Sequence, residues 1–314
     1  MNRRLLVALG IGFLACFTNL IWLTLWPNAA WDFTWPLRGA QVLLQGQNPY
    51  VVQLPDLPYP PPPLYYPLPA VLIALPFSPF SDTIASALFT GCSTALLVFG
   101  LTRDGTWWRL SLLLSPSYLI ALRTIQWSPL LTAAALLPAL APLWIAKPNL
   151  GLPLFVYAPS KRSLYGMIVF GVASLFVLPS WPIGWWHNLE QNIHTSPLLT
   201  FAGGGFLLLL ALLRWRDPSA RLLLAMAILP QRLLYYDQLP LWLCVRSLRQ
   251  SVLLSICGWA GLFAWVLVSG ESPLSVDPPW VVASFYLPTL GILLWSAYGR
   301  RVRTILGDAQ AATA

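Results

Sequence analysis

The sequence contains little charge for its length. Charged side chains make up 9% of the 314 residues, and hydrophobic side chains make up 57%. A soluble domain carries about 25% charged residues. Most of the surface of this chain must therefore face lipid rather than water, which excludes an ordinary soluble globular domain.

The sequence also lacks the usual signatures of metal, nucleotide and hydrolase sites. It contains no Walker motif, no G-x-G-x-x-G, no G-x-S-x-G and no H-E-x-x-H. Its cysteines lie in apolar segments without metal-ligand spacing, where they act as small apolar side chains; they are Cys16, Cys92, Cys244 and Cys257. We therefore expect neither a metal nor a cofactor.

Long uncharged apolar runs take the place of these motifs. Residues 5–26 and 251–269 contain no charged side chain, and each can cross a hydrocarbon core of about 30 Å as a helix. The runs are apolar on every side rather than alternating, which argues against a membrane β-barrel. The pattern predicts an all-α, polytopic transmembrane bundle of about ten spans, with residues 128–146 as one span and residues 68–80 re-entrant.

The distribution of basic residues predicts the orientation of this bundle. The net charge is +8, but the basic residues cluster at the ends of spans, so no nucleic-acid partner is needed to explain them. In the ten-span map, all of them except Arg38, Arg123 and Arg232 lie on the cytoplasmic side, as the positive-inside rule requires. This topology predicts a multi-pass membrane protein and places Lys147 inside. Because no organelle targeting signal appears in the sequence, we expect the membrane to be a bacterial inner (plasma) membrane.

The chain is predicted to form one domain. Residues 1–303 form the membrane domain, and residues 304–314 form a disordered cytoplasmic tail. A long first extracytoplasmic loop covers about residues 27–67. Within it, residues 35–45 have the pattern of a short interfacial helix that Gly46 ends.

Asp32 is the polar residue that most needs an explanation. It follows the first span among aromatic residues, which mark a membrane interface. A partly desolvated carboxylate there gains basicity and can accept a proton from an acceptor hydroxyl. A solvated loop residue or a helix cap is the alternative interpretation.

Other polar residues lie on predicted outer turns. Arg232 and Asp237 either pair with each other at the interface or serve function, because charge at membrane depth is costly. Arg123 and Gln126 share another outer turn, where Arg123 can bind phosphate or anchor lipid headgroups. His187 is either an interfacial side chain or a ligand-binding one.

Several of these positions together resemble a known family. Asp32 follows the first span, and a short helix then ends in a Leu-x-x-Gly-x-x-Pro-Tyr-like turn. Farther along the chain come a Tyr-Pro element at Tyr66, a Gln before an apolar run at Gln126, and a Lys-Pro at Lys147. This order resembles the GT-C superfamily of membrane glycosyltransferases, and most nearly glycosyltransferase family 87, the polyprenol-phosphate-mannose-dependent mannosyltransferases. The turn is carried by Leu43 or Leu44, Gly46, Pro49 and Tyr50.

The chain departs from this family at two positions. Ile125 stands where the family has a glycine before the glutamine. The late Pro-x-x-Trp-x-His element is replaced by residues 230–237, which contain no histidine. If that histidine assists the chemistry, the resemblance implies that Tyr236 or Asp237 substitutes for it, or that the protein is inactive or uses a different donor.

The resemblance implies an enzyme that transfers a sugar, mannose in most of the family, from a polyprenyl-phosphate donor to a lipid or glycan hydroxyl. Asp32 would be the general base of an inverting single displacement on the extracytoplasmic face, and Arg123 or Arg232 would hold the phosphate. No metal is expected, and the partners are membrane lipids, the donor and the acceptor. The residues assigned to donor or acceptor binding are Arg38, Tyr50, Tyr66, Arg123, Gln126, His187, Arg232, Tyr236 and Asp237. A transporter or flippase, and a non-catalytic family member, are the alternatives.

Overall fold

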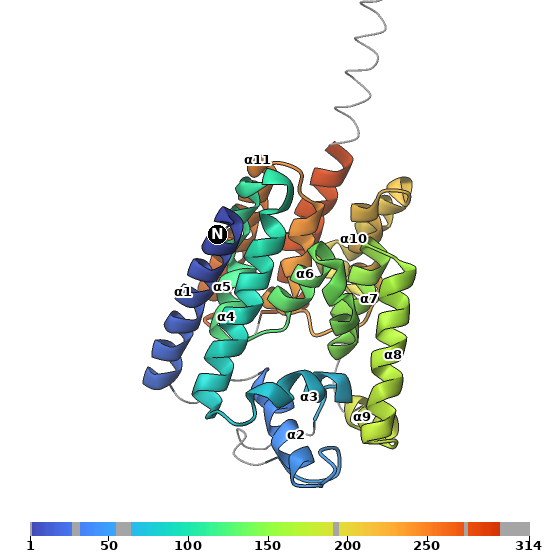
Figure 1. The fold of residues 1–314 in the computed structure, drawn as a ribbon. Coiled ribbons are helices and arrows are strands. Elements are labelled where there is room, and N and C mark those ends of the chain that lie inside the picture. The colour runs from blue at the N-terminus through green and yellow to red at the C-terminus, as the bar shows by residue number, and fades with distance from the viewer. Residues whose placement is uncertain (1, 27–31, 55–63, 191–194, 273–275, 296–314) are drawn as a thin grey trace, which may run out of the picture.

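The computed structural model describes residues 2–26, 32–54, 64–190, 195–272 and 276–295 (Figure 1). The tail predicted to be disordered, residues 304–314, and part of the predicted first loop lie outside the described residues. The described part of the chain is helical, and its only β-type pairing is an isolated bridge between Thr195 and Gln231. This confirms the all-α prediction.

Four described helices are long and apolar enough to cross a membrane, and a fifth crossing segment results if one bent pair is counted as a unit. The pair is α8 with α9, which meet at 102°. These lengths are compatible with a membrane protein, whereas the count of ten spans stays a prediction. The long helices are α1 (Arg3–Leu25), α4 (Asp82–Leu101), α11 (Leu248–Ser269) and the segment Pro278–Trp295; the bent pair is α8 (Lys161–Val177) and α9 (Trp181–Glu190).

Shorter helices lie between the long ones, and some of them are buried while others are largely exposed. Prolines begin or interrupt many of them, which keeps them short because proline lacks the N–H of the helical hydrogen bond. The α-helices among them are α5 (Pro116–Arg123), α6 (Ser128–Leu136), α7 (Pro148–Tyr157) and α10 (Pro218–Ile228), whereas α12 (Pro278–Val281) begins the long segment Pro278–Trp295. The tighter helices are η3 (Arg103–Gly105), η4 (Trp107–Leu114), η5 (Pro138–Ala146), η6 (Pro197–Leu199), η7 (Phe201–Gly203), η8 (Gly205–Arg214) and η9 (Tyr235–Cys244). The π-helix η10 (Val282–Tyr286) continues α12 within the long segment. Of the shorter helices, α6 and η9 are examples of buried ones, whereas η8 is largely exposed.

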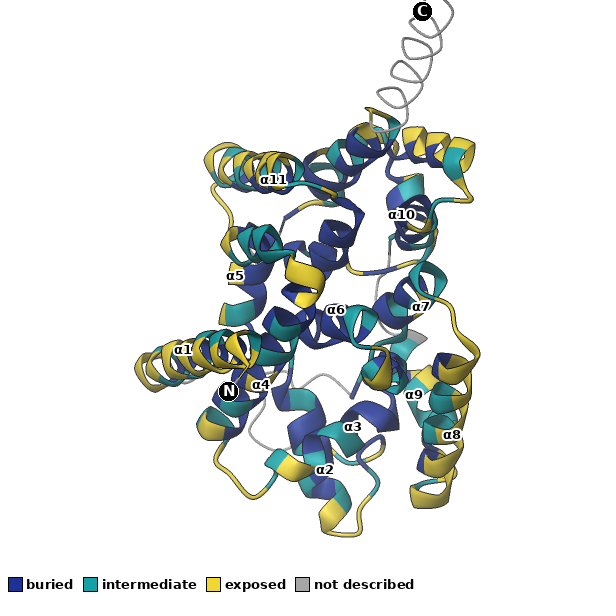
Figure 2. Cartoon of the chain, turned by 45° about the horizontal axis from the view of Figure 1, so that its top comes forward, coloured by how far each residue is buried: buried dark blue, intermediate teal, exposed yellow. Residues whose placement is uncertain are grey.

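The outer helices contain many exposed residues, whereas the inner ones are mostly buried (Figure 2), and many of the exposed residues are apolar. Phe13 of α1, Phe176 of α8 and Leu267 of α11 are 73%, 85% and 84% exposed, whereas Trp127 and Trp144 are fully buried in the interior. Large apolar surfaces of this kind fit contact with lipid tails.

A layer of short helices closes one end of the bundle (Figure 1). It contains α2 (Thr34–Leu44), α3 (Leu68–Ala74) and η2 (Leu75–Phe77). The predicted first-loop helix is therefore confirmed, and Gly46 follows it with φ +75°, a left-handed conformation that glycine adopts without strain. Residues 68–77 form a segment shorter than a full span that packs against α2.

The close contact between α1 and α4 depends on glycine. An added Cβ at Gly12 would lie 2.7 Å from the Cβ of Ala95 and 2.8 Å from the carbonyl oxygen of Gly91. We expect Gly12→Val to push the helices apart and to lower the free energy of unfolding in detergent by about 1–3 kcal/mol. Gly10→Val is the matched control, because no atom lies within 4 Å of its added Cβ. Equal losses in the two variants would contradict the role of this contact.

Candidate active site

The centre of the candidate site is a lysine between two carboxylates. Lys147 Nζ donates to Asp237 Oδ1 at 2.7 Å and lies 3.4 Å from Asp32 Oδ2. We call Asp32, Lys147 and Asp237 the charged triad. The three residues are far apart in the sequence, so only the tertiary fold brings them together.

Each member of the triad lies next to a helix end. Asp32 lies two residues before α2, and Asp237 lies in the first turn of η9. Lys147 separates η5 from α7 and is extended, with φ −142° and ψ 82°. Pro148 explains this break, because a proline disfavours the helical conformation in the residue before it.

Burial and neighbouring charge act on the protonation of Asp237 and Lys147, which lie outside the long helices. The side chains of Asp237, Lys147 and Asp32 are 4%, 12% and 22% exposed. Burial raises the pKa of Asp237 to about 6, although the nearby Lys147 lowers it. Burial lowers the pKa of Lys147, but the charges of Asp237 and Asp32 outweigh that effect and raise it above its usual value. Lys147 is therefore a cation at neutral pH.

Two phenols and an amide surround the triad. Burial raises the pKa of Tyr66 well above its usual value, and the charge and hydrogen bond of Asp32 raise it further. Burial raises the pKa of Tyr236 well above its usual value, and its ring lies 5.5 Å from Lys147 Nζ, a cation–π distance. The side chain of Gln126 counters part of that pKa shift, and its Nε2 donates to the Thr124 hydroxyl at 3.1 Å. These polar groups suit recognition of sugar hydroxyls.

The backbone before Gln126 is strained. Ile125 has φ +52°, in the left-handed region that is rare for a β-branched residue, and its side chain is 1% exposed. Glycine, the family residue that Ile125 replaces, adopts this conformation freely. The strain fixes the direction in which Gln126 enters the site.

A pair of variants at Ile125 measures this strain. Ile125→Ala and Ile125→Gly both remove the buried side chain, so they differ mainly in the cost of the left-handed backbone. We expect the glycine variant to be the more stable by about 1 kcal/mol. Thermal unfolding of the two in detergent tests this, and a more stable alanine variant would show that the backbone there is relaxed.

The structure corrects the placement of Lys147. Residues 128–146, predicted as one span, form a hairpin in which η5 folds back along α6, and Trp144 Nε1 donates to the carbonyl oxygen of Leu131 at 3.1 Å. The break comes at Leu137, just before Pro138. Lys147 therefore lies near the beginning of the hairpin and beside Asp32, not on the opposite side. The two prolines of η5, Pro138 and Pro142, were the available sequence signal.

Three of the predicted binding residues make no described hydrogen bond or ion pair with the triad. Arg38 pairs with Asp82 at 2.5 Å, Arg123 lies over the ring of Trp22 at 4.6 Å, and His187 is exposed on α9. These basic residues were chosen for their predicted outer turns, but sequence does not give the direction of a side chain.

The other predicted residues lie in or beside the site. Tyr50 supports Tyr66, because its hydroxyl donates to the Tyr66 carbonyl oxygen at 2.9 Å. Arg232 is exposed, but its charge lowers the pKa values of Asp237 and Tyr236. In the described residues, Asp237 forms its ion pair with Lys147 rather than with Arg232.

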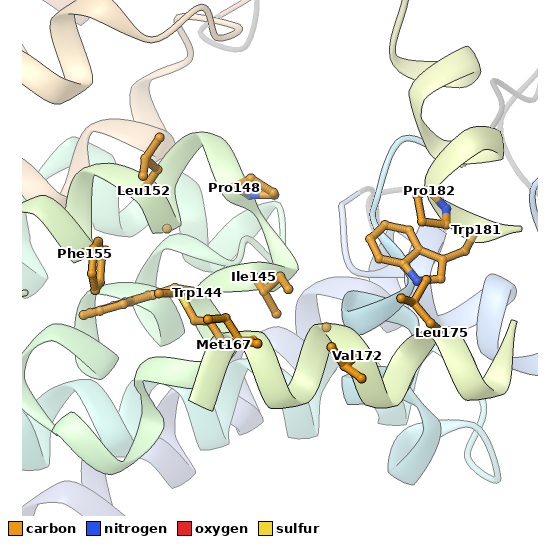
Figure 3. A pocket seen from close by; sticks show the side chains of 13 residues that line it. Trp144, Ile145, Pro148, Leu152, Phe155, Met167, Val172, Leu175, Trp181 and Pro182 are labelled. Carbon is orange, nitrogen blue, oxygen red and sulfur yellow. The ribbon is translucent and has the colours of Figure 1, made fainter. Parts of the chain in front are cut away.

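An apolar groove of about 460 Å³ lies between two walls of helices (Figure 3). One wall comes from η5 and α7 and includes Pro148, which directly follows Lys147. The other wall comes from α8 and the beginning of α9. The side chains in Figure 3 are almost entirely apolar, so the groove suits a hydrocarbon chain rather than a sugar.

These features rest on the chain's own residues. Comparison of the chain with protein-family models, with curated proteins and with solved structures gives no match.

Proposed function

We propose that the chain is a GT-C-type integral membrane glycosyltransferase with about ten spans. It moves a sugar, mannose by the family resemblance, from a polyprenyl-phosphate donor to a hydroxyl of a lipid or glycan. The transfer takes place on the extracytoplasmic face of a bacterial inner membrane. The observation that carries this proposal is the charged triad, together with an apolar groove whose lining includes Pro148, the residue after Lys147.

The triad contains the groups that the reaction needs. Asp32 accepts the proton of the acceptor hydroxyl as the hydroxyl oxygen attacks the anomeric carbon. The bond between that carbon and the phosphate oxygen breaks, and its electron pair leaves on the polyprenyl phosphate. A single displacement inverts the anomeric centre. Lys147 and Arg232 offer positive charge to the departing phosphate.

The groove supports a lipid-linked donor. Its apolar walls suit an isoprenoid chain. One lining residue, Pro148, directly follows Lys147 in the chain, so a lipid bound there could present its phosphate to the ammonium. A soluble nucleotide-sugar would gain nothing from this groove.

A transporter or flippase of a lipid-linked substrate is the second candidate, favoured by buried charge together with a lipid-sized groove. It requires transfer across the membrane without cleavage of the sugar–phosphate bond. A non-catalytic family member is the third candidate.

Donor turnover separates these functions. Membranes containing the chain are supplied with polyprenyl-phosphate mannose, and release of polyprenyl phosphate is measured beside membranes without the chain. Release that depends on the chain supports the transferase. Donor flux in vesicles without release would support the transporter, and absence of both with correctly folded protein would favour the non-catalytic member.

A further inference from the structure

The two carboxylates beside Lys147 are not equivalent partners. Asp237 Oδ1 lies 2.7 Å from the ammonium nitrogen, and Asp32 Oδ2 lies 3.4 Å from it. Asp237 is 4% exposed and Asp32 is 22% exposed. The closer partner is therefore also the more buried one.

This asymmetry determines which contact an incoming anion can replace. A buried carboxylate that loses its cation pays a large desolvation cost, whereas a more exposed one regains contact with water. The lysine ammonium has three N–H donors on a flexible stem, so it can change one partner while it keeps another. The exchangeable partner of Lys147 is therefore Asp32.

We propose that Asp237 is a positioning residue, which retains Lys147 in the site while a phosphate oxygen of the donor replaces Asp32 at the ammonium. The proposal rests on the proposed function. The exchange releases the Asp32 carboxylate from its cation, so Asp32 becomes an effective base only after the donor has bound. Acceptor activation is thereby coupled to donor binding.

The charged groups around Asp237 determine how a fall in pH affects the exchange of partners at Lys147. Lys147, Asp32 and Arg232 influence its ionisation, and its own charge acts on buried phenols of the surrounding elements, namely Tyr66, Tyr236 and Tyr286. Below a pH of about 6, the pKa of Asp237, its carboxyl becomes neutral and no longer holds the ammonium by charge. Acidification therefore imitates Asp237→Asn.

The experiment separates phosphate binding from turnover in the full-length chain. Asp237→Asn removes one negative charge without changing shape, so we expect it to bind farnesyl phosphate at least as tightly as the unaltered chain. Turnover of polyprenyl-phosphate mannose should nevertheless fall by about 10- to 100-fold, because Lys147 then pairs with Asp32 alone. Asp237→Glu keeps the carboxylate and should recover part of the turnover. The unaltered chain should lose turnover on acidification through a pH of about 6, a step that Asp237→Asn lacks.

Several results would overturn the proposal. Undiminished turnover in Asp237→Asn is one, and a parallel loss of farnesyl phosphate binding and turnover in a folded variant is another, because that indicates a structural role. If Asp237→Asn does not fold, absence of the acid step in the unaltered chain still overturns it. An unaltered chain that neither binds farnesyl phosphate nor turns over the donor would remove the proposed function and this proposal together.

Discussion

Asp32→Asn is expected to reduce donor turnover by about 100- to 10,000-fold, the range that removal of a general base produces. The amide matches the carboxylate in shape but cannot accept the proton of the acceptor hydroxyl. Loss of the Asp32 carboxylate also leaves Lys147 paired with Asp237 alone, its closer partner. Release of polyprenyl phosphate at matched protein level measures the effect.

Asp82→Asn is the matched control for this experiment. Asp82 is also paired with a cation, Arg38, and its side chain is 28% exposed, close to the 22% of Asp32. It lies outside the charged triad, so its variant should keep turnover within a few-fold. Equal loss in both variants would show that acidic residues there support folding, and full turnover in Asp32→Asn would exclude Asp32 as the base.

Lys147→Met is expected to cause the largest loss of stability, about 3–5 kcal/mol, because it leaves a buried carboxylate without its cation. The loss should be smaller at pH 5 than at pH 8. The reason is that the pKa of Asp237 is raised, and removal of Lys147 raises it further, so acid neutralises the unpaired group. Unfolding in detergent at the two pH values measures this.

The double variant Lys147→Met with Asp237→Asn serves as the control. It removes the cation and its closer partner together, so no carboxylate is left unpaired at the buried position. We expect it to recover much of the stability that Lys147→Met loses. If the double variant is as unstable as the single one, shape rather than charge accounts for the loss.

The sequence analysis selected several residues that the fold brings together, but it misplaced the cation at their centre. Asp32, Tyr66, Gln126, Tyr236 and Asp237 were selected from interfacial position and family resemblance, and the fold brings them together. These residues flank helix ends, where sequence signals are strong.

Lys147 was misplaced because hydropathy averages over the break at Leu137. An apolar run of 19 residues, 128–146, has the length of one span whether it is straight or folded in two. The packing of Trp144 against the backbone of Leu131 decides between these forms. That contact depends on tertiary structure, which composition and charge counting do not contain.

The length of the hairpin formed by α6 and η5 also determines the position of Lys147. Gln126 lies just before its first arm and Lys147 just after its second, so the number of residues between them determines where the ammonium lies. Deletion of one residue from a 3₁₀ arm shortens it by about 2 Å and rotates the residues after it by roughly 120°. A contact of 2.7 Å does not survive such a shift. We therefore expect the chain to tolerate insertions and deletions in this segment less well than the exchange of one apolar side chain for another.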